Sequence, residues 1–297
     1  MFSIIKKNSK FDFLGFRKGA IFFSSLLIIF SIISFIANGL NWGIDFSNGY
    51  IAQLQYQKDV NITELKTNLK NNGVNDSIVQ YYGTNKEVII KLKDSPKFDQ
   101  VSINNFLIKS LSADNKFKIL RLEYVGSQVG SELREKGEWA MLVALLSILI
   151  YIGFRFEFLY GIGAIFALLH DVILTLGFFS ITQLQFDLSV LSAILAVIGY
   201  SLNDTIVVYD RIRENMRLIR KNDFIDILNI SVNQTLSRTI ITSLTTLFVL
   251  FSLLLAGGIA VKFFAIAMIV GVLVGTYSSI FIASTSLYYL GIGSEEK

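Results

Sequence analysis

Six apolar runs divide this sequence, and their lengths suit helices that cross a lipid bilayer. The hydrocarbon core of a bilayer is about 30 Å thick and an α-helix rises about 1.5 Å per residue, so roughly 20 apolar residues span it. Hydrophobic residues make up 53% of the chain, as is typical of membrane proteins. We therefore expect a membrane α-helical fold with six transmembrane helices, at residues 19–37, 139–154, 159–181, 188–209, 239–256 and 263–290.

Residues 38–137, between the first two runs, are far more polar and predict a folded domain outside the membrane. Asn61 is a candidate helix cap because Glu64 follows it at the spacing of a capping box. A second helix is expected beyond Pro96, and alternating apolar residues predict four strands. In order these are a strand at 50–56, a helix at 62–70, strands at 78–82 and 88–93, the second helix, and a strand at 117–125. This order is that of a split βαβ unit, so we expect an inserted α+β ferredoxin-like domain, followed by a helix bundle at 138–290.

The basic residues indicate which way the chain crosses the membrane. Lys and Arg cluster before the first run, after the second and after the fourth, whereas the loops after the third and fifth runs contain few of them, with Lys262 as the exception. By the positive-inside rule, residues 1–18 and 291–297 are expected in the cytoplasm and the inserted domain in the periplasm. No small-residue cleavage site follows the first run, so we expect it to remain as a helix. This topology accounts for the net charge of +4, which therefore indicates membrane lipid and no nucleic acid as a partner.

His170 and Asp171 lie near the middle of the third run, where an ionisable group is most costly. A histidine beside an aspartate is a suitable proton acceptor and donor pair near neutral pH. The same pair could equally serve as a buried structural contact that bonds to backbone or hydroxyl groups of neighbouring helices. Residue types alone leave both readings open.

Asn203 and Asp204 interrupt the fourth run, which then ends in basic residues. An ionised carboxylate in hydrocarbon costs about 2.5 to 3.5 kcal/mol, so Asp204 needs a partner, a water-filled cavity or protonation. It could also reach toward Arg211, about 10 Å along the helix, and have a structural role. Asp204 is turned about 100° from Asn203, which shares a small, polar face suited to helix packing with Ser192, Ala196 and Gly199.

Arg238 begins the fifth run and could be a simple anchor at the membrane surface. A stripe of hydroxyl residues follows it at helical spacing, which favours a polar path or a bundle-facing surface with Arg238 at its mouth: Thr239, Thr242, Ser243 and Thr246. In the sixth run, small residues recur every four positions and predict a packing ridge, not a reactive site: Ala267, Gly271, Gly275, Ser279 and Ala283.

The turn at residues 43–49 contains Gly43, Asp45 and Gly49, which could have a structural role or act as a gate or domain hinge. The chain contains no cysteine and lacks phosphate-loop, metalloprotease and nucleophile-elbow motifs, so we predict neither an enzyme, nor a cofactor, nor a metal site. An intramembrane aspartyl protease is poorly supported because Ser-Leu-Asn precedes Asp204.

Several motifs together resemble one family. Residues 199–204 read Gly-Tyr-Ser-Leu-Asn-Asp and residues 207–215 read Val-Val-Tyr-Asp-Arg-Ile-Arg-Glu-Asn; the turn 43–49, the His170-Asp171 pair and residues 237–243 complete the pattern. The sequence is similar to the SecF family of bacterial protein-translocase subunits, of the resistance-nodulation-division type, over most of its length. Asn48 stands where that family usually has glycine, and asparagine tolerates the same turn conformation better than most residues.

This resemblance implies a component of the Sec pathway in the bacterial inner membrane. The expected partners are SecD, the SecY-SecE-SecG channel, YajC and YidC, together with the translocating polypeptide. The resemblance further implies that the proton motive force drives export, with Asp204 and Arg238 serving proton passage. Asn203, His170 and Asp171 are the further candidates for proton coupling. Two alternatives are a non-energised scaffold for the translocon and a small-molecule exporter of the same superfamily. An Asp204→Asn substitution separates the first alternative from the proton-driven device, because only the latter depends on the charge.

Overall fold

A computed structural model describes residues 11–43, 45–46, 49–74, 77–82, 84–93, 100–111, 116–156, 158–219, 223–258 and 261–292. The chain forms two compact units. The α+β unit consists of Trp42–Glu138, and the helical unit consists of the chain before and after that segment, Met1–Asn41 and Trp139–Lys297. The expectations for residues 1–10, the tail after Ile292 and the departure at Asn48 lie outside the described residues.

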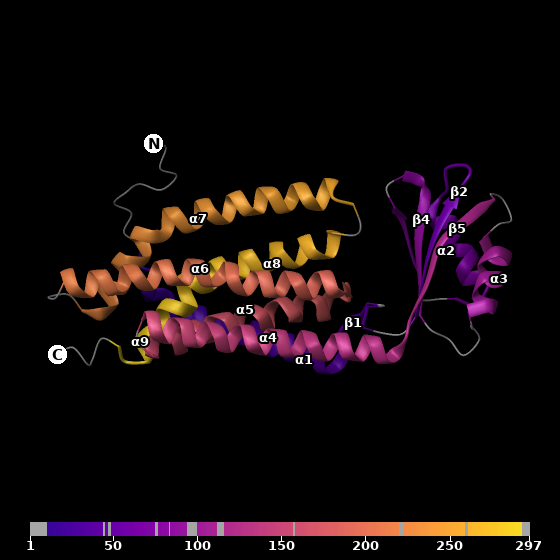
Figure 1. Cartoon of the computed structure of the whole chain (residues 1–297). Coiled ribbons are helices and arrows are strands. Elements are labelled where there is room, and N and C mark those ends of the chain that lie inside the picture. The colour runs from indigo at the N-terminus through magenta and orange to yellow at the C-terminus, as the bar shows by residue number, and fades with distance from the viewer. Residues whose placement is uncertain are drawn as a thin grey trace. The chain divides into compact units, whose positions relative to one another are not determined.

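The described residues include six helices that are long and apolar enough to span a membrane. Figure 1 shows them lying along one another in the helical unit. They are α1 (Arg17–Asn38, after the 3₁₀ turn Leu14–Phe16), α4 (Ser127–Arg155), α5 (Phe158–Thr182), α6 (Leu188–Leu218), α7 (Phe224–Ala256) and α8 (Lys262–Ser278), which continues through a π-turn (Ser279–Ala283) into α9 (Ser284–Tyr289). Short strands β1 (Asn41–Trp42) and β6 (Gln185–Phe186) lie outside these helices.

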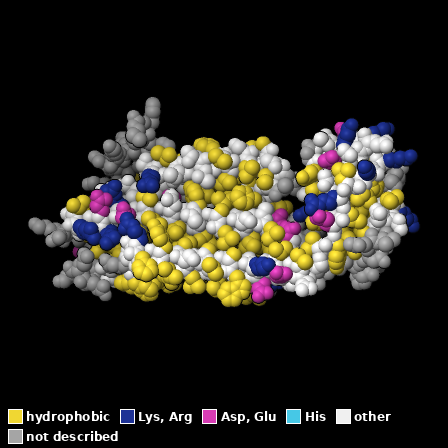
Figure 2. Space-filling model, in the orientation of Figure 1, with side chains coloured by type: hydrophobic (Ala, Val, Ile, Leu, Met, Phe, Trp, Pro, Cys, Tyr) yellow, Lys and Arg dark blue, Asp and Glu magenta, His cyan; other side chains and the backbone are white. Residues whose placement is uncertain are grey.

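The most buried spans are α5, α6 and α8, whereas α1, α4 and α7 expose much of their surface. The exposed side chains on these three helices are mainly large and apolar, such as Phe22, Ile150 and Phe248. Figure 2 shows hydrophobic side chains over much of the visible side of the helical unit. In a bilayer these apolar side chains face lipid without a free-energy cost. Burying polar side chains among the central helices does cost free energy, and those residues therefore require a specific explanation.

The fifth span begins much earlier than its apolar run predicted, at Phe224 and not at residue 239. Its first turns are rich in asparagine, serine and glutamine but bury Ile227, Leu228 and Val232 against the rest of the unit. Tertiary burial therefore extends a helix that hydropathy alone does not reveal. By contrast, α6 begins at Leu188 as predicted, because the Asp187 side chain accepts a hydrogen bond from Val190 N at 3.1 Å and caps it.

The α+β unit contains the strands and helices that alternation predicted. They are β2 (Gly49–Tyr56), α2 (Ile62–Asn71), β3 (Ser77–Tyr82), β4 (Thr84–Lys93), α3 (Gln100–Leu111) and β5 (Phe117–Val125). The sheet order is β3-β4-β2-β5 and all neighbouring strands are antiparallel, with Ala52 of β2 opposite both Ile90 and Leu122. The predicted cap also forms, since Asn61 Oδ1 accepts from Thr63 N at 2.9 Å.

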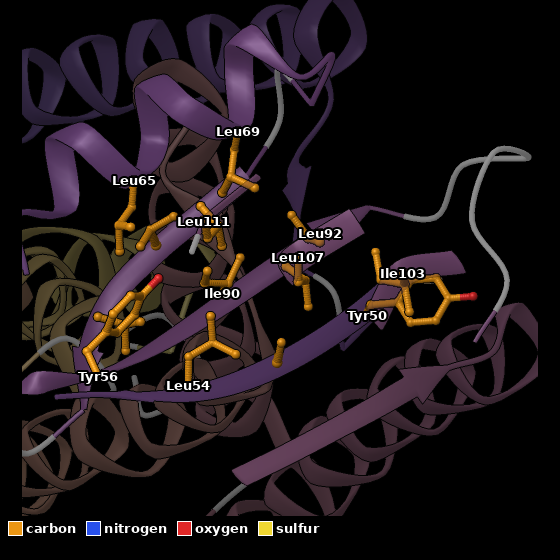
Figure 3. Close-up of a cluster of buried hydrophobic side chains, with 13 residues drawn as sticks. Tyr50, Leu54, Tyr56, Leu65, Leu69, Ile90, Leu92, Ile103, Leu107 and Leu111 are labelled. Atoms are coloured by element: carbon orange, nitrogen blue, oxygen red, sulfur yellow. The ribbon is translucent and has the colours of Figure 1, made fainter. Parts of the chain in front are cut away.

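Alternate residues of β2 and β4 point into the hydrophobic core of this unit, where they meet leucines and isoleucines of α2 and α3 (Figure 3). Among them, Leu54, Leu69, Ile90 and Leu107 are fully buried. Gly49 begins β2 at a close approach between strands, since a Cβ there would lie 2.4 Å from Leu92 O. Gly49 is thus required by sheet geometry, because any larger residue would push β4 away.

Tyr56 is expected to limit the stability of the α+β unit, and Tyr56→Phe to raise its free energy of unfolding by about 1 kcal/mol. The side chain is 3% exposed, and its hydroxyl has no hydrogen-bond partner within the described part of the chain. Burial raises the pKa of Tyr56 above its ordinary value. Since the folded state then holds this proton more tightly than the unfolded state, wild-type stability should fall as pH rises above about 10, and the variant should lose less.

Urea unfolding of the purified full-length protein in detergent, followed by Trp42 fluorescence in a Trp139→Phe background at pH 8 and at pH 10.5, measures both effects. Tyr82→Phe is the matched control, because Tyr82 lies on β3 of the same sheet but is 49% exposed. Equal responses of the two variants to pH would contradict the assignment to Tyr56.

Candidate functional site

Asp171 lies where three central helices meet and is 1% exposed. Its Oδ1 is 2.9 Å from Nδ1 of His170, the preceding residue on α5. Its Oδ2 accepts hydrogen bonds from Ser201 Oγ of α6 at 2.5 Å and from Ser278 Oγ of α8 at 2.7 Å. The carboxylate thus accepts hydrogen bonds from α6 and α8, which tie both helices to α5, and it contacts His170 within α5.

The second ring nitrogen of His170 continues these contacts toward α1. His170 Nε2 is 3.2 Å from Ser24 Oγ, which in turn is 3.0 Å from the hydroxyl of Tyr277 on α8. The Tyr277 hydroxyl donates to Ala20 O at 3.1 Å. A continuous line of polar atoms thus leads from Asp171 in the centre of the unit to the backbone of α1.

Two glycines of α8 allow this close approach. A Cβ on Gly271 would lie 2.1 Å from Val197 Cγ2, and one on Gly275 would lie 3.0 Å from Ser201 Cβ and 3.5 Å from Asp171 Oδ2. The small ridge predicted in the sixth run therefore packs directly on α6. It also borders the polar cluster, because Gly275 and Ser278 occupy the same turn.

Asp204 lies one turn beyond Ser201 on α6, about 4.5 Å along the helix, and is 3% exposed. The charge of Arg238 on α7 acts on it, and Thr242 lies nearby on the same helix, with its own hydroxyl directed to Arg238 O and Thr239 O. Asp204 Oδ2 has no hydrogen-bond partner among the residues described. Asp204 can consequently accept a proton without breaking a contact of that oxygen, whereas both oxygens of Asp171 are engaged.

The hydroxyl stripe after Arg238 faces the bundle. Thr239 and Ser243 are buried, and Ser243 Oγ lies 2.7 Å from Thr276 Oγ1 of α8. Arg238 itself is exposed near the start of the stripe. The structure thus places Asp204, Arg238 and the stripe on facing sides of α6 and α7, and places His170 and Asp171 in a separate cluster between α1, α5, α6 and α8.

Gly199 and Asn203 do not have the packing use within this chain that their small, polar face predicted. Both are exposed, as are Ser192 and Ala196, and a Cβ on Gly199 would meet no atom within 4 Å. The reason is rotational: the opposite face of α6 carries Val197 and Ser201, which contact α8. Helical spacing correctly separates Asn203 from Asp204 but cannot tell which face meets a neighbour from the same chain.

The turn at Gly43 and Asp45 belongs to the α+β unit. Phe46 N donates to Gly43 O at 3.0 Å, and the Phe46 ring packs edge-on against Trp42 with centroids 5.4 Å apart. Together with the close approach at Gly49, these contacts give the segment a structural use. A gating role for Gly43, Asp45 and Gly49 stays a prediction.

Several residues of the polar cluster could not be selected from the sequence. Ser24, Ser201, Tyr277 and Ser278 are ordinary residues of apolar helices, and only their partners distinguish them. The one sequence signal that could have identified them is an uncharged polar side chain on the inward face of an apolar helix.

Two asparagines on α7 also escaped sequence reasoning. Asn233 binds the backbone of Phe11 through both its oxygen, at 3.0 Å from Phe11 N, and its nitrogen, at 2.8 Å from Phe11 O. Asn229 Oδ1 accepts from Leu14 N at 2.9 Å, and its nitrogen donates to Asp12 Oδ1 at 2.8 Å. The segment before α1 is therefore fastened to the first half of α7.

Comparison with known proteins identifies the family. A family model for the C-terminal part of the protein export membrane proteins SecD and SecF matches residues 107–292, and a model for the SecD/SecF GG motif matches residues 33–60. The protein translocase subunit SecF of Calditerrivibrio nitroreducens is 46% identical over 292 residues, which cover 97% of this chain and 96% of that protein. The chain belongs to the SecF family. The Vibrio alginolyticus SecF is 43% identical over 99% of this chain and 94% of its own length.

A solved structure agrees with this SecF assignment. The crystal structure of SecDF, a translocon-associated membrane protein from Thermus thermophilus, matches 99% of this chain with a TM-score of 0.80 and 35% identity. This chain spans 40% of that SecDF chain. The SecF family model includes the positions of His170, Asp171, Asp204 and Arg238, and the GG-motif model includes Gly43 to Gly49. As a SecF-family protein with six apolar helices, the chain is a multi-pass membrane protein.

Proposed function

We propose that this chain is a subunit of the Sec accessory complex that works with SecD and uses the proton motive force to promote protein translocation across the bacterial inner membrane. The observation that carries the proposal is Asp204, a buried acid in an apolar helix, which faces Arg238 and has a carboxylate oxygen without a partner among the described residues. Membrane acids with these properties typically mark ion or proton pathways.

SecD is the proposed partner in the membrane. The solved SecDF chain is much longer than this one, which spans 40% of it. The exposed small face of α6, with Gly199 and Asn203, suits close packing with a helix from another chain, since glycine lets backbones approach and asparagine can bond across the contact. The further partners that follow from the proposed role are the SecY-SecE-SecG channel, YajC, YidC and the translocating polypeptide.

The proposed orientation places both termini in the cytoplasm and the α+β unit in the periplasm. Basic residues after α4 and α6 support it, because Arg155, Arg211, Arg213 and Arg217 gather at those helix ends. We further assign the α+β unit to the ferredoxin-like fold. Its support is the β3-β4-β2-β5 order with one helix in each of the two crossovers.

A proton on Asp204 would act through its neighbour α7. Neutralising the carboxylate removes its attraction to Arg238, so the packing of α6 on α7 changes in response. The first half of α7 is held by Asn215 of α6, whose nitrogen donates to Ser231 Oγ at 2.8 Å. Movement is therefore expected in the second half, beyond Ser243, where most side chains are exposed.

The test is export of a secreted reporter in cells depleted of their native SecF and supplied with this chain, with and without an uncoupler. A proton-driven subunit restores export that the uncoupler abolishes. Restored export that persists in the presence of the uncoupler would instead identify a non-energised scaffold. No restoration, with membrane insertion confirmed, would contradict a role in export and favour the small-molecule exporter.

A further inference from the structure

We propose that His170 holds a proton inside the helical unit as an imidazolium ion, paired with Asp171 on one side and donating Nε2–H to Ser24 on the other. The proton state follows from contacts alone. Its use in coupling rests on the proposed function, because a second proton-binding group matters only if protons drive the protein.

The first step is that Asp171 is ionised. Ser201 and Ser278 both donate hydroxyl hydrogen bonds to Asp171 Oδ2, and donors directed at a carboxylate favour its ionised form. The other oxygen, Oδ1, lies 2.9 Å from His170 Nδ1. A carboxylate that receives three donors is an acceptor only, so His170 Nδ1 carries a hydrogen.

The second step counts hydrogens along the line from Ala20 to His170. The Tyr277 hydroxyl has a single hydrogen and donates it to Ala20 O. Tyr277 can then only accept from Ser24, whose own single hydrogen is used in that contact. Ser24 Oγ must therefore accept from His170 Nε2. With hydrogens on both ring nitrogens, His170 is the cation.

The neutral alternative leaves one contact without a hydrogen. If His170 Nε2 carried none, Ser24 would donate to it and Tyr277 would donate to Ser24. The Tyr277 oxygen and Ala20 O would then lie 3.1 Å apart with no hydrogen between them. Two oxygen acceptors at that distance repel one another. The observed contacts therefore require a hydrogen on Nε2, and with Asp171 ionised the ring is the imidazolium. A neutral ring, with that proton on Asp171 Oδ1, would instead have an unprotonated Nδ1.

The surroundings of His170 favour its charge. Its ring is 3% exposed and lies 6.0 Å from the Tyr277 ring, with the planes inclined by 30°, so an aromatic face lies beside the cation. Asp171 makes the pair neutral overall, which avoids the cost of a lone carboxylate in the membrane. The other charged groups on α1, α5, α6 and α8 are Asp204, on the side of α6 toward α7, and groups near helix ends: Arg17 and Lys18 on α1, Lys262 on α8, and Asp210, Arg211, Arg213, Glu214 and Arg217 on α6.

Loss of this proton would reverse the direction of hydrogen bonding at the Ser24 hydroxyl and then at the Tyr277 hydroxyl. Once His170 Nε2 gives up its hydrogen to solvent, Ser24 turns to donate to it, Tyr277 turns to donate to Ser24, and the bond to Ala20 O is lost. The contact between α8 and α1 thus exists in two arrangements that differ by one proton. Asp171 keeps its three donors in both, so the exchange leaves α5, α6 and α8 tied together.

The experiment uses the fact that the chain contains a single histidine. The full-length protein, labelled with ¹⁵N-histidine, purified through a non-histidine tag and placed in liposomes, gives one pair of ring nitrogen signals by solid-state NMR. At pH 7 both nitrogens are expected to give protonated signals. A wild-type spectrum with one unprotonated nitrogen would overturn the proposal.

Two variants probe the hydroxyl line. Ser24→Ala removes the acceptor of Nε2–H, and Tyr277→Phe frees the Ser24 hydrogen to bond Nε2, so each is expected to lose the protonated Nε2 signal at pH 7. Ser31→Ala is the matched control, because Ser31 is a buried serine of the same helix that packs against Gly177 and not against His170. Variants that retain the wild-type spectrum would also refute the assignment.

These measurements require neither SecD nor a proton gradient, so they separate this inference from the proposed function. If the NMR spectrum shows the imidazolium but export is unaffected by the uncoupler, only the proposed function is contradicted. In the export assay, Ser24→Ala is expected to lose several-fold of the gradient-dependent export, and Ser31→Ala none. Normal export by a Ser24→Ala protein that has lost the proton would overturn the coupling role of His170.

Discussion

Asp204→Asn is expected to abolish the gradient-dependent part of export while leaving membrane insertion unchanged. Asparagine has nearly the same shape as aspartate and can form hydrogen bonds, but it cannot bind and release a proton in this range. The substitution should not disturb the fold, because Asp204 Oδ2 has no partner to lose among the described residues. Arg238→Met should give the same loss, since it removes the charge that acts on Asp204.

The measurement is reporter export in cells depleted of native SecF, with the amount of inserted protein determined for each variant. Asp210→Asn provides the control on the same helix. Asp210 is exposed and, within the described part of the chain, its ion pair is with Arg155 at 3.6 Å, so export should remain normal. If Asp204→Asn inserted and exported normally, coupling would have to be sought at His170 and Asp171 or in SecD.

Gly271→Val is expected to destabilise the helical unit by about 1 to 3 kcal/mol or more, the usual cost of forcing extra atoms into a packed core. A Cβ at this position would lie 2.1 Å from Val197 Cγ2, so α6 and α8 would have to separate. Separation would also draw Ser278 away from Asp171, where the two now lie 2.7 Å apart. The measurement is the midpoint of thermal unfolding of the purified protein in detergent.

Gly199→Val is the matched substitution, since it places the same side chain in a neighbouring apolar helix where a Cβ meets no atom within 4 Å. Its unfolding midpoint should stay at the wild-type value, while its co-purification with SecD should fall. Equal losses of stability in both variants would indicate a general effect of valine on helix formation and would contradict the packing argument.

The fold was largely predictable because its two strongest signals are local. Apolar runs identify transmembrane helices by length alone, and alternation with turns identifies the strands of the α+β unit. The beginning of α7 at Phe224 was not predictable in this way. Its first turns contain Asn229 and Asn233, which disfavour a helix in isolation, and only contacts with Phe11 and Leu14 explain them.

The site was predictable only where it carries charge. His170, Asp171 and Asp204 are conspicuous because ionisable residues are rare in apolar runs. Ser201 and Ser278 are not, since serine is common in membrane helices and its role depends on helix rotation and on a partner far along the chain. Gly199 shows the same limit in reverse: its spacing indicated packing, but the face that it occupies meets nothing described in this chain.

The asparagine contacts before α1 have a consequence for how the sequence can change over time. Asn233 contacts residue 11 through main-chain atoms, and Asn229 binds the main-chain nitrogen of residue 14 as well as the Asp12 side chain. Main-chain atoms are present whatever the side chain is. Substitutions at residue 11 can therefore accumulate without loosening this attachment, whereas a change at Asn233 removes both of its hydrogen bonds to Phe11 at once.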